Sequence, residues 1–317
     1  MIKVDRIECP DILKTGMNPE SDGEWESKDA IAFFSVVANH KLQYKRTGIS
    51  GLRIKESFSV YADKEVRKQL KRMSHGKCAY CESKITSIYS GDIEHFRPKG
   101  GYGEDNPITK PGYYWLASDW NNLLFACPFC NQTNTHEILD NKTIIEVVQG
   151  KLNQFPLLTE NYRLNYGHGN LYFSDPANYK IAFDLEETER LLLKPCTDTD
   201  IGKYFEYDEI GLITPSLGLN NFEEIKAKTS IRVYALQRVG LVQSREEKVI
   251  QIKAQIRRVE EALINLNFHI EDSNEIITWF EGILRKELNI LHQFKESNRE
   301  YAGLARFIIE QYFNNLS

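Results

Sequence analysis

The spacing of hydrophobic residues divides the chain into a mixed first part and a helical last part. From residue 222 to residue 316 proline is absent, glycine is rare, and apolar residues recur every three or four positions. This spacing is typical of helices that bury one face. It predicts helices over residues 225–242, 250–266, 276–294 and 301–313.

A shorter amphipathic pattern lies earlier in the chain, over residues 63–73. Val66, Leu70 and Met73 fall at helical spacing, and Asp63 stands where an N-cap residue is expected. Basic residues occupy most of the remaining positions: Lys64, Arg67, Lys68, Lys71 and Arg72. Such a face is either an ordinary solvated surface or a surface that contacts phosphates beside an active site.

The rest of the chain has weaker periodicity. Residues 1–40 are mixed, residues 74–99 suggest a turn with short strands, and residues 136–151 suggest an insertion. Glycine, proline and aspartate punctuate residues 166–220, with short strand-like runs such as 203–207. We therefore expect an α+β protein. Residues 1–165 form one domain with its core at about 75–157, and residues 166–317 form a connecting segment and a helical region.

Composition points to a globular protein outside the membrane. Hydrophobic residues make up 41% of the 317 residues and charged residues 27%. There is no apolar run long enough for a bilayer and no signal-peptide pattern, so we expect a cytoplasmic protein without a membrane partner. The net charge of −5 argues against a free-standing nucleic-acid binder. However, Lys41 to Lys84 contains twelve basic and four acidic residues, which concentrates positive charge in one segment.

Four of the six cysteines form two CxxC pairs, Cys78 with Cys81 and Cys127 with Cys130. In a reducing compartment this pattern indicates a metal site rather than disulfides. Four thiolates suit the tetrahedral geometry of a structural zinc ion. The remaining two, Cys9 and Cys196, are expected to be buried or unreactive.

A group of residues suited to hydrolysis lies between and beside these pairs. His95 can accept a proton from water at neutral pH. Glu94 and Asn131 offer oxygen ligands for a catalytic Mg²⁺ or Mn²⁺, and Asp92 is a reserve ligand. Asn122 could fix the loop or orient His95. Adjacent residues on a regular strand point to opposite faces, so Glu94 and His95 must leave regular geometry or address opposite sides of one phosphate.

Several neighbouring residues have two interpretations, one in the site and one in the surface or core. Arg97 and Lys99 could clamp substrate phosphates or be surface charges. His136 is a weaker candidate ligand, because on a helix it would not share a face with Asn131. The aromatic residues at 113–115 and 120 could stack on bases, but core packing is the better interpretation.

Taken together, these motifs resemble a known family. The sequences Cys-Ala-Tyr-Cys-Glu at 78–82, Ile-Glu-His-Phe-Arg-Pro-Lys at 93–99, Tyr-Tyr-Trp-Leu-Ala at 113–117 and Cys-Pro-Phe-Cys-Asn at 127–131 are similar to those of HNH nucleases of the PtuB type. These are the nuclease subunits of Septu anti-phage systems and of some retron systems. The resemblance covers about residues 70–250, with support from 155–157, 192–195 and 236–245.

The resemblance implies a ββα-metal core, with His95 as the base, Glu94 and Asn131 near the metal, and the four cysteines on zinc. It also implies a partner, an SMC- or ABC-like ATPase of the PtuA type, and in retron systems a reverse transcriptase with its DNA. The chain departs from the family pattern after Asn131, where a basic residue is common, and over residues 137–151.

Two hypotheses about function follow. The first is a metal-dependent endonuclease in anti-phage defence, with DNA as the preferred substrate and RNA such as tRNA as the alternative. The second is a non-catalytic, zinc-stapled scaffold or nucleic-acid-binding protein. The second would need the four cysteines but would have no use for Glu94, His95 and Asn131.

Overall fold

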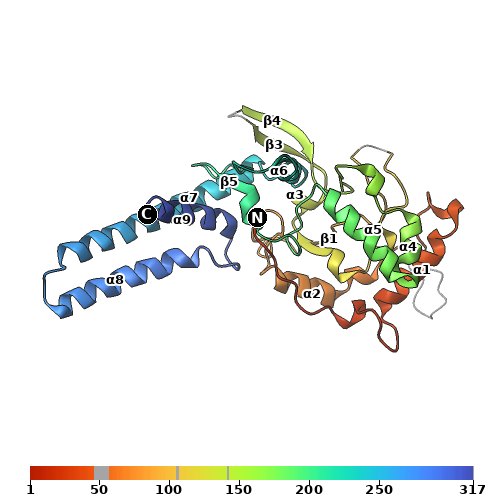
Figure 1. Cartoon of the computed structure of the whole chain (residues 1–317), viewed down its shortest axis with the longest axis horizontal. Coiled ribbons are helices and arrows are strands. Elements are labelled where there is room, and N and C mark those ends of the chain that lie inside the picture. Colours follow the sequence, from red (N-terminus) through yellow and green to blue (C-terminus); the bar gives the residue numbers. More distant parts are fainter. Residues whose placement is uncertain (46–56, 105–106, 141–142, 317) are drawn as a thin grey trace.

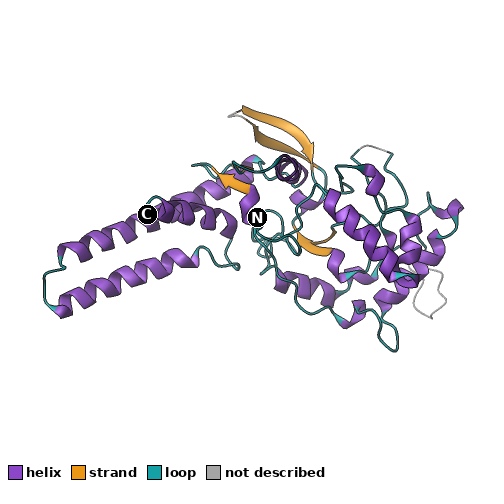
Figure 2. Ribbon diagram, in the orientation of Figure 1, coloured by secondary structure: helices purple, strands orange, loops and turns teal. Residues whose placement is uncertain are grey.

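The computed structural model describes residues 1–45, 57–104, 107–140 and 143–316. A compact part contains most of the short elements, and a bundle of long helices extends from one side of it (Figure 1). Helices dominate, and the strands are few and short (Figure 2). Part of the basic segment noted above, residues 46–56, lies outside the described residues. The predicted mixture of helix and sheet is confirmed.

Among the described residues, two α-helices precede the cysteine motifs, α1 (Asp22–Phe34) and α2 (Lys64–Met73). Asp63 caps α2 by accepting a hydrogen bond from the Glu65 backbone N–H at 2.7 Å. Val66, Leu70 and Met73 are buried, and the basic residues are on the outer side. The prediction for this helix is confirmed in both its start and its buried face.

The strands in the described part of the chain form three antiparallel pairs. β1 (Asp92–His95) pairs with β2 (Leu123–Ala126), and His95 lies opposite Leu123. The short helix α3 (Pro128–Asn131) follows β2 directly. β3 (Asn134–Asp140) and β4 (Thr143–Gln149) form a projecting ribbon from the residues predicted to be an insertion (Figure 1). β5 (Phe205–Tyr207) pairs with β6 (Ile213–Pro215).

The prediction of turns and short strand-like runs over residues 166–220 missed two helices. α4 (Tyr166–Ser174) has 9 residues and α5 (Pro176–Glu189) has 14, so together they occupy 23 of the 55 residues from 166 to 220. Asp175 caps α5 through the Asn178 N–H, and Pro176 takes the first helical position, where its missing N–H costs nothing. The punctuating residues therefore mark helix starts here rather than loops.

The last part is helical, as predicted, with one break in an unexpected place. α6 (Asn221–Val233) ends before α7 (Val239–Phe268), so the expectation of one helix over 225–242 is wrong. Ala235 has a left-handed backbone with φ of 50°, which a continuous right-handed helix does not allow. α8 (Asn274–Gln293) and α9 (Ala302–Asn314) agree with the predicted ranges.

Short 3-10 turns complete the described secondary structure. They are Asp11–Leu13, Val37–Asn39, Val60–Ala62, Tyr114–Leu116, Trp120–Asn122, Glu160–Tyr162 and Ile201–Tyr204.

Within the described ranges, one large hydrophobic core contains residues of both predicted domains. It contains Phe96 and Phe125 of the first part together with Leu192, Tyr234 and Leu304 of the second. A smaller cluster holds α7, α8 and α9 together through residues such as Ile252, Leu291 and Ile309. Within the described ranges, no helix has the length and apolarity to cross a membrane.

Candidate metal centre and catalytic cavity

The four predicted cysteine ligands come together in the core. The Sγ atoms of Cys78, Cys81, Cys127 and Cys130 all lie within 4.8 Å of one another, and each residue is buried. The Cys81–Cys127 separation is 3.8 Å. Four sulfurs at the usual Zn–S distance of about 2.3 Å from one ion would be about 3.8 Å apart. The cluster is therefore compatible with a structural metal such as zinc.

Local backbone geometry explains how each pair presents its sulfurs. At the first pair, Glu82 N–H donates to the Cys78 carbonyl and Cys78 N–H to the Ser83 carbonyl, so the chain turns back within six residues. At the second pair, Asn131 N–H donates to the Cys127 carbonyl at 3.0 Å. Ala79 N–H donates to the Phe125 carbonyl and joins the first turn to β2.

Arg238, just before α7, contributes positive charge to this cluster. Its guanidinium lies 3.5 Å from Cys130 Sγ and 4.0 Å from Cys127 Sγ. A zinc ion with four thiolates has a net charge of −2, so a buried cation beside the sulfurs offsets part of that charge. Sequence analysis did not find this residue, which is more than 100 positions away from the cysteines it contacts.

A cavity of about 480 Å³ lies beside the cluster and contains most of the predicted catalytic residues. Asp92, Glu94, His95, Lys99 and Asn131 all line it. Further lining residues are Tyr61, Arg67, Gln132 and Asn153. Glu94 and His95 thus reach the same cavity although they are consecutive in β1.

His95 has a defined orientation in the cavity wall. Its Nε2 lies 2.8 Å from the Ala117 carbonyl, which can only accept, so Nε2 carries the proton. Nδ1 is then the basic nitrogen, and it lies 3.3 Å from Lys99 Nζ. Burial lowers the pKa of His95 well below 6.5, and the charge of Lys99 lowers it further. The imidazole is therefore neutral at physiological pH, which is the state that a general base needs.

Glu94 is held by a buried lysine that sequence analysis did not single out. Lys151 Nζ lies 2.6 Å from Glu94 Oε1 and donates to the His95 carbonyl at 2.9 Å. Burial raises the pKa of Glu94, and Lys151 opposes that shift. No local signal marks Lys151, because the contact joins residues 57 positions apart in the chain.

Asn131 and Asp92 approach each other across the cavity. Asn131 Nδ2 and Gln132 Nε2 donate to Asp92 Oδ2 at 2.9 and 3.0 Å. Asp92 Oδ1 accepts from the Tyr89 hydroxyl at 2.6 Å. Oxygen donors suited to Mg²⁺ or Mn²⁺ therefore line one cavity. In the described part of the chain, the four sulfurs alone form a converging group of three or more His, Cys, Asp or Glu ligand atoms.

Asn122 acts on the backbone rather than on the cavity. Its side chain accepts from the Arg97 N–H at 2.8 Å and donates to the Arg97 and Leu116 carbonyls at 2.9 and 3.1 Å. Asn122 is buried and absent from the cavity lining. It fixes the chain two residues after His95, which agrees with the loop-pinning role among the sequence-based alternatives.

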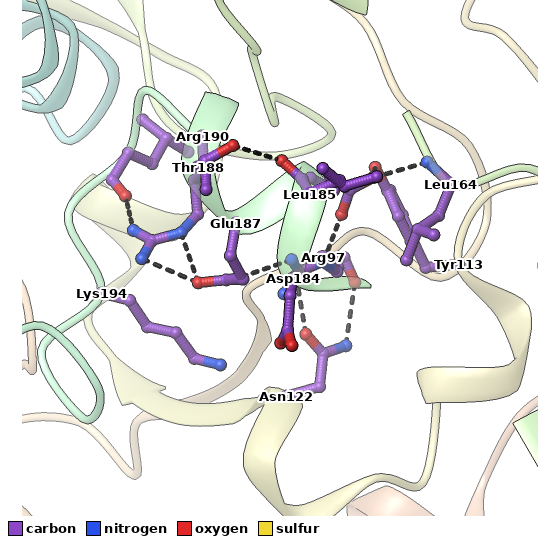
Figure 3. Close-up of polar contacts among 12 residues, drawn as sticks. Arg97, Tyr113, Asn122, Leu164, Asp184, Leu185, Glu187, Thr188, Arg190 and Lys194 are labelled. Carbon is purple, nitrogen blue, oxygen red and sulfur yellow. Dashed lines mark hydrogen bonds and ion pairs between the residues drawn. The ribbon is translucent and has the colours of Figure 1, made fainter. Parts of the chain in front are cut away.

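Arg97 lies in a network of charged and polar side chains (Figure 3). Its Nε lies 2.7 Å from Glu186 Oε1, it also pairs with Glu187, and its residue exposure is 1%. Glu186 accepts further bonds from Tyr113 Oη and the Leu164 N–H. The Arg97 guanidinium is thus engaged by carboxylates in the core, and Arg97 does not line the cavity.

The other candidates divide between the cavity and the core. Lys99 lines the cavity, and its Nζ lies 4.4 Å from the centre of the Tyr61 ring. Burial lowers the pKa of Lys99 to about 8. His136 lies on β3 rather than on a helix and packs near Phe129. The aromatic residues Tyr113, Tyr114, Trp115 and Trp120 are buried, which confirms their interpretation as core.

Comparison with known proteins gives similarity over almost the whole chain. The Septu protein PtuB of Bacillus mycoides (strain KBAB4) is 29% identical over 322 residues, which cover 99% of this chain and 91% of that protein. This full-length similarity supports a PtuB-type protein. No family model matches the chain.

Two further relatives match over shorter stretches. The Septu protein PtuB of Bacillus thuringiensis is 34% identical over 82 residues, or 25% of this chain and 27% of that protein. The Septu protein PtuA of Bacillus mycoides (strain KBAB4) is 25% identical over 184 residues, or 57% of this chain and 20% of that protein. The similarity to the Bacillus mycoides PtuB, which covers 99% of this chain, extends well beyond the cysteine motifs.

Proposed function

We propose that this protein is a metal-dependent endonuclease of the HNH type that acts in Septu anti-phage defence. The observation that carries the proposal is the single cavity lined by Glu94, His95, Lys99 and Asn131 beside the four-cysteine cluster. Similarity to proteins named Septu PtuB and Septu PtuA supports the biological setting. In this proposal, β1, β2 and α3 make up the ββα core.

His95 is the general base. Its Nδ1 faces the cavity side occupied by Lys99, and its Nε2 is anchored on the Ala117 carbonyl. The imidazole accepts the proton of the attacking water through Nδ1, and the anchor keeps the ring in the tautomer that allows this. Lys99 then provides a cation for a phosphate oxygen of the scissile group.

Glu94 and Asn131 are the proposed ligands of a divalent cation, with Asp92 in reserve. A bound Mg²⁺ or Mn²⁺ would supply charge stabilisation at the phosphate and at the leaving oxygen. Magnesium is commonly held by one or two carboxylates together with substrate phosphates. Among the described residues, Asp92 and Glu94 do not belong to a converging group of three or more His, Cys, Asp or Glu ligand atoms. Their arrangement with Asn131 is compatible with a cation that takes some of its ligands from a substrate phosphate.

The substrate is nucleic acid, with DNA preferred and RNA as the alternative, and the partner is a PtuA-type ATPase. Helix α2 presents the exposed basic residues Lys64, Lys68, Lys71 and Arg72, and Arg67 lines the cavity. The backbone of a nucleic acid could follow this face into the cavity. The net charge of −5 suits a subunit that gains nucleic-acid affinity from its complex.

A cleavage assay with two histidine variants tests the proposal. Wild type, His95→Ala and His136→Ala would be incubated with Mg²⁺ or Mn²⁺, alone and with a PtuA-type partner, on plasmid DNA and bulk tRNA. His136 is buried like His95 but does not line the cavity. Loss of about 10²- to 10⁴-fold in rate is expected for His95→Ala alone.

The assay also separates the proposal from a scaffold role. Zinc content should be equal in all three proteins, because neither histidine is a ligand of the four-cysteine cluster. If zinc-loaded wild type cuts neither substrate with the partner present, the endonuclease proposal is wrong, and a zinc-stapled binding protein is the better description.

A further inference from the structure

The ammonium group of Lys151 contacts both consecutive residues of the proposed catalytic strand. It lies 2.6 Å from the Glu94 carboxylate and 2.9 Å from the His95 carbonyl. Consecutive residues of a regular strand point to opposite faces, yet Glu94 and His95 both line one cavity here. A group bonded to the side chain of one and the backbone of the other can stabilise this arrangement.

The backbone around Lys151 is fixed on the cysteine cluster. Its N–H donates to the Cys130 carbonyl at 3.0 Å, and the next N–H, of Leu152, donates to the Asn131 carbonyl at 2.7 Å. The preceding residue, Gly150, passes so close to α3 that a Cβ would lie 1.9 Å from the Gln132 carbonyl oxygen. Position 150 therefore requires glycine, and Lys151 is held against the end of α3.

From these contacts we propose that Lys151 is a positioning residue that sets Glu94 and His95 relative to Asn131. The proposal rests on the function proposed above. The backbone N–H of Lys151 is hydrogen-bonded to Cys130 in the helix that also carries Asn131. Its side chain reaches the strand that carries Glu94 and His95. A carboxylate has two oxygens, so Glu94 can keep its ion pair through Oε1 and bind a cation through the other oxygen.

Burial makes this role specific to an ammonium group. Lys151 has no exposed surface, and its side chain ends at two acceptors, a carboxylate and a carbonyl. An apolar replacement would leave the Glu94 carboxylate buried without its counter-ion. The carboxylate would then leave its present position, which alters the geometry of the cavity.

The matched control is Lys194, a second buried lysine near the same aromatic ring. Lys194 Nζ lies 5.1 Å and Lys151 Nζ 6.0 Å from the centre of the Phe96 ring. Only Lys151 of this pair contacts Glu94 and His95 among the described residues. Lys151→Met and Lys194→Met therefore remove the same chemical group at similar depth.

The test measures cleavage kinetics and the His95 imidazole NMR signals of the full, zinc-loaded chain with its partner. We expect Lys151→Met to lower kcat about 10- to 100-fold with KM changed less than about twofold, because misplacement of catalytic groups acts on the chemical step. We expect its His95 imidazole signals to shift. Lys194→Met should leave kcat within about twofold of wild type and the His95 signals in place.

Each other result has a defined meaning. A Lys151→Met protein with normal kcat and unmoved His95 signals overturns the proposal, as does an equal loss in Lys194→Met. If Lys151→Met does not fold, Lys151→Gln decides, since it keeps a donor without the charge: lowered kcat at constant KM supports the role, and unchanged kcat overturns it. If wild type does not cleave, the proposed function fails, and the His95 signals alone decide the role of Lys151.

Discussion

His95 and Lys99 face each other at 3.3 Å, and this pair governs the pH response of the proposed site. Burial and the Lys99 charge hold the pKa of His95 below 6.5. A general base works when it is neutral, so kcat/KM should stay constant as the pH falls through 6.5 and decline only at more acidic pH. Rate profiles between about pH 4.5 and 8 would measure this.

A Lys99→Met variant provides the comparison. Removal of the neighbouring cation should raise the pKa of His95, so the acidic decline should begin at higher pH than in wild type. A decline that stays at the same pH would show that Lys99 does not act on His95, even if the overall rate falls.

Arg97 is expected to matter for stability rather than for substrate binding. Burial opposes ionisation of Glu187, but the charges of Arg97 and Arg190 outweigh it and lower the pKa of that carboxyl to about 2. Arg97→Met would leave Glu186 and Glu187 without this partner, and we expect it to lower the free energy of unfolding by about 3–5 kcal/mol. Chemical denaturation of zinc-loaded protein at pH 7 would measure the change.

The ion pair between Arg97 and Glu187 predicts part of the loss of folding stability at acidic pH. The pKa of Glu187 is lower in the folded state than its ordinary value of 4.5. Its stabilisation is therefore complete above about pH 4.5 and is lost as the pH falls toward 2. Glu187→Gln should be less stable at pH 7 and should show a weaker pH dependence over this acidic range; an unchanged slope would contradict the assignment.

At the scale of elements, helix α2 has one buried apolar face and one exposed basic face. Val66 and Leu70 are fully buried, and the outer face carries Lys64, Lys68 and Lys71. If this face follows the nucleic-acid backbone, replacement of the three lysines by glutamine should raise KM and reduce the salt dependence of binding. The slope of log K against log salt should fall by about 0.9 for each lost contact to a DNA phosphate.

Three exposed lysines elsewhere form the control for α2. Lys228, Lys253 and Lys286 lie on α6, α7 and α8, and their replacement by glutamine changes the net charge equally. Anisotropy measurements on labelled DNA at several salt concentrations would compare the two triple variants. Equal slopes would mean that net charge, and not the α2 face, determines binding.

Local sequence rules predicted the start of α2 but missed α5 and the break between α6 and α7. The start of α2 at Asp63 was predictable because a cap and a buried stripe agree. α5 was missed, although Asp175 followed by Pro176 is a usual helix start. The break between α6 and α7 was also missed, because the apolar spacing continues through Ala235 while the backbone there turns left-handed.

At the scale of the whole molecule, the helical region is packed against the cysteine cluster. Tyr234, between α6 and α7, stacks on Tyr80 of the first CxxC turn at 3.9 Å between ring centres. Lys77 donates to the Arg299 carbonyl, and Ser83 Oγ lies 3.2 Å from Tyr301 Oη. The cysteine cluster and the C-terminal helices are thus expected to be stabilised together.

Arg238 gives this coupling a direct test. Arg238→Met removes the guanidinium beside Cys127 and Cys130, so zinc should be released at lower chelator concentration than from wild type. Arg245→Met is the control, because Arg245 of α7 is also buried but donates to the Leu236 carbonyl. Competition with a coloured zinc chelator would measure both, and equal release would show that Arg238 does not act on the metal.

The sequence by itself determined the parts that depend on residue type and short spacing. Two CxxC pairs indicated the sulfur cluster, and Glu94, His95 and Asn131 were identified as residues of one site because their chemistry is distinctive. Only the tertiary structure decided which charges reach that site. Arg97 turned inward to α5, whereas Lys151 and Arg238 reached Glu94 and the sulfurs. Those contacts join distant segments through burial and ion pairing, and no short-range pattern specifies them.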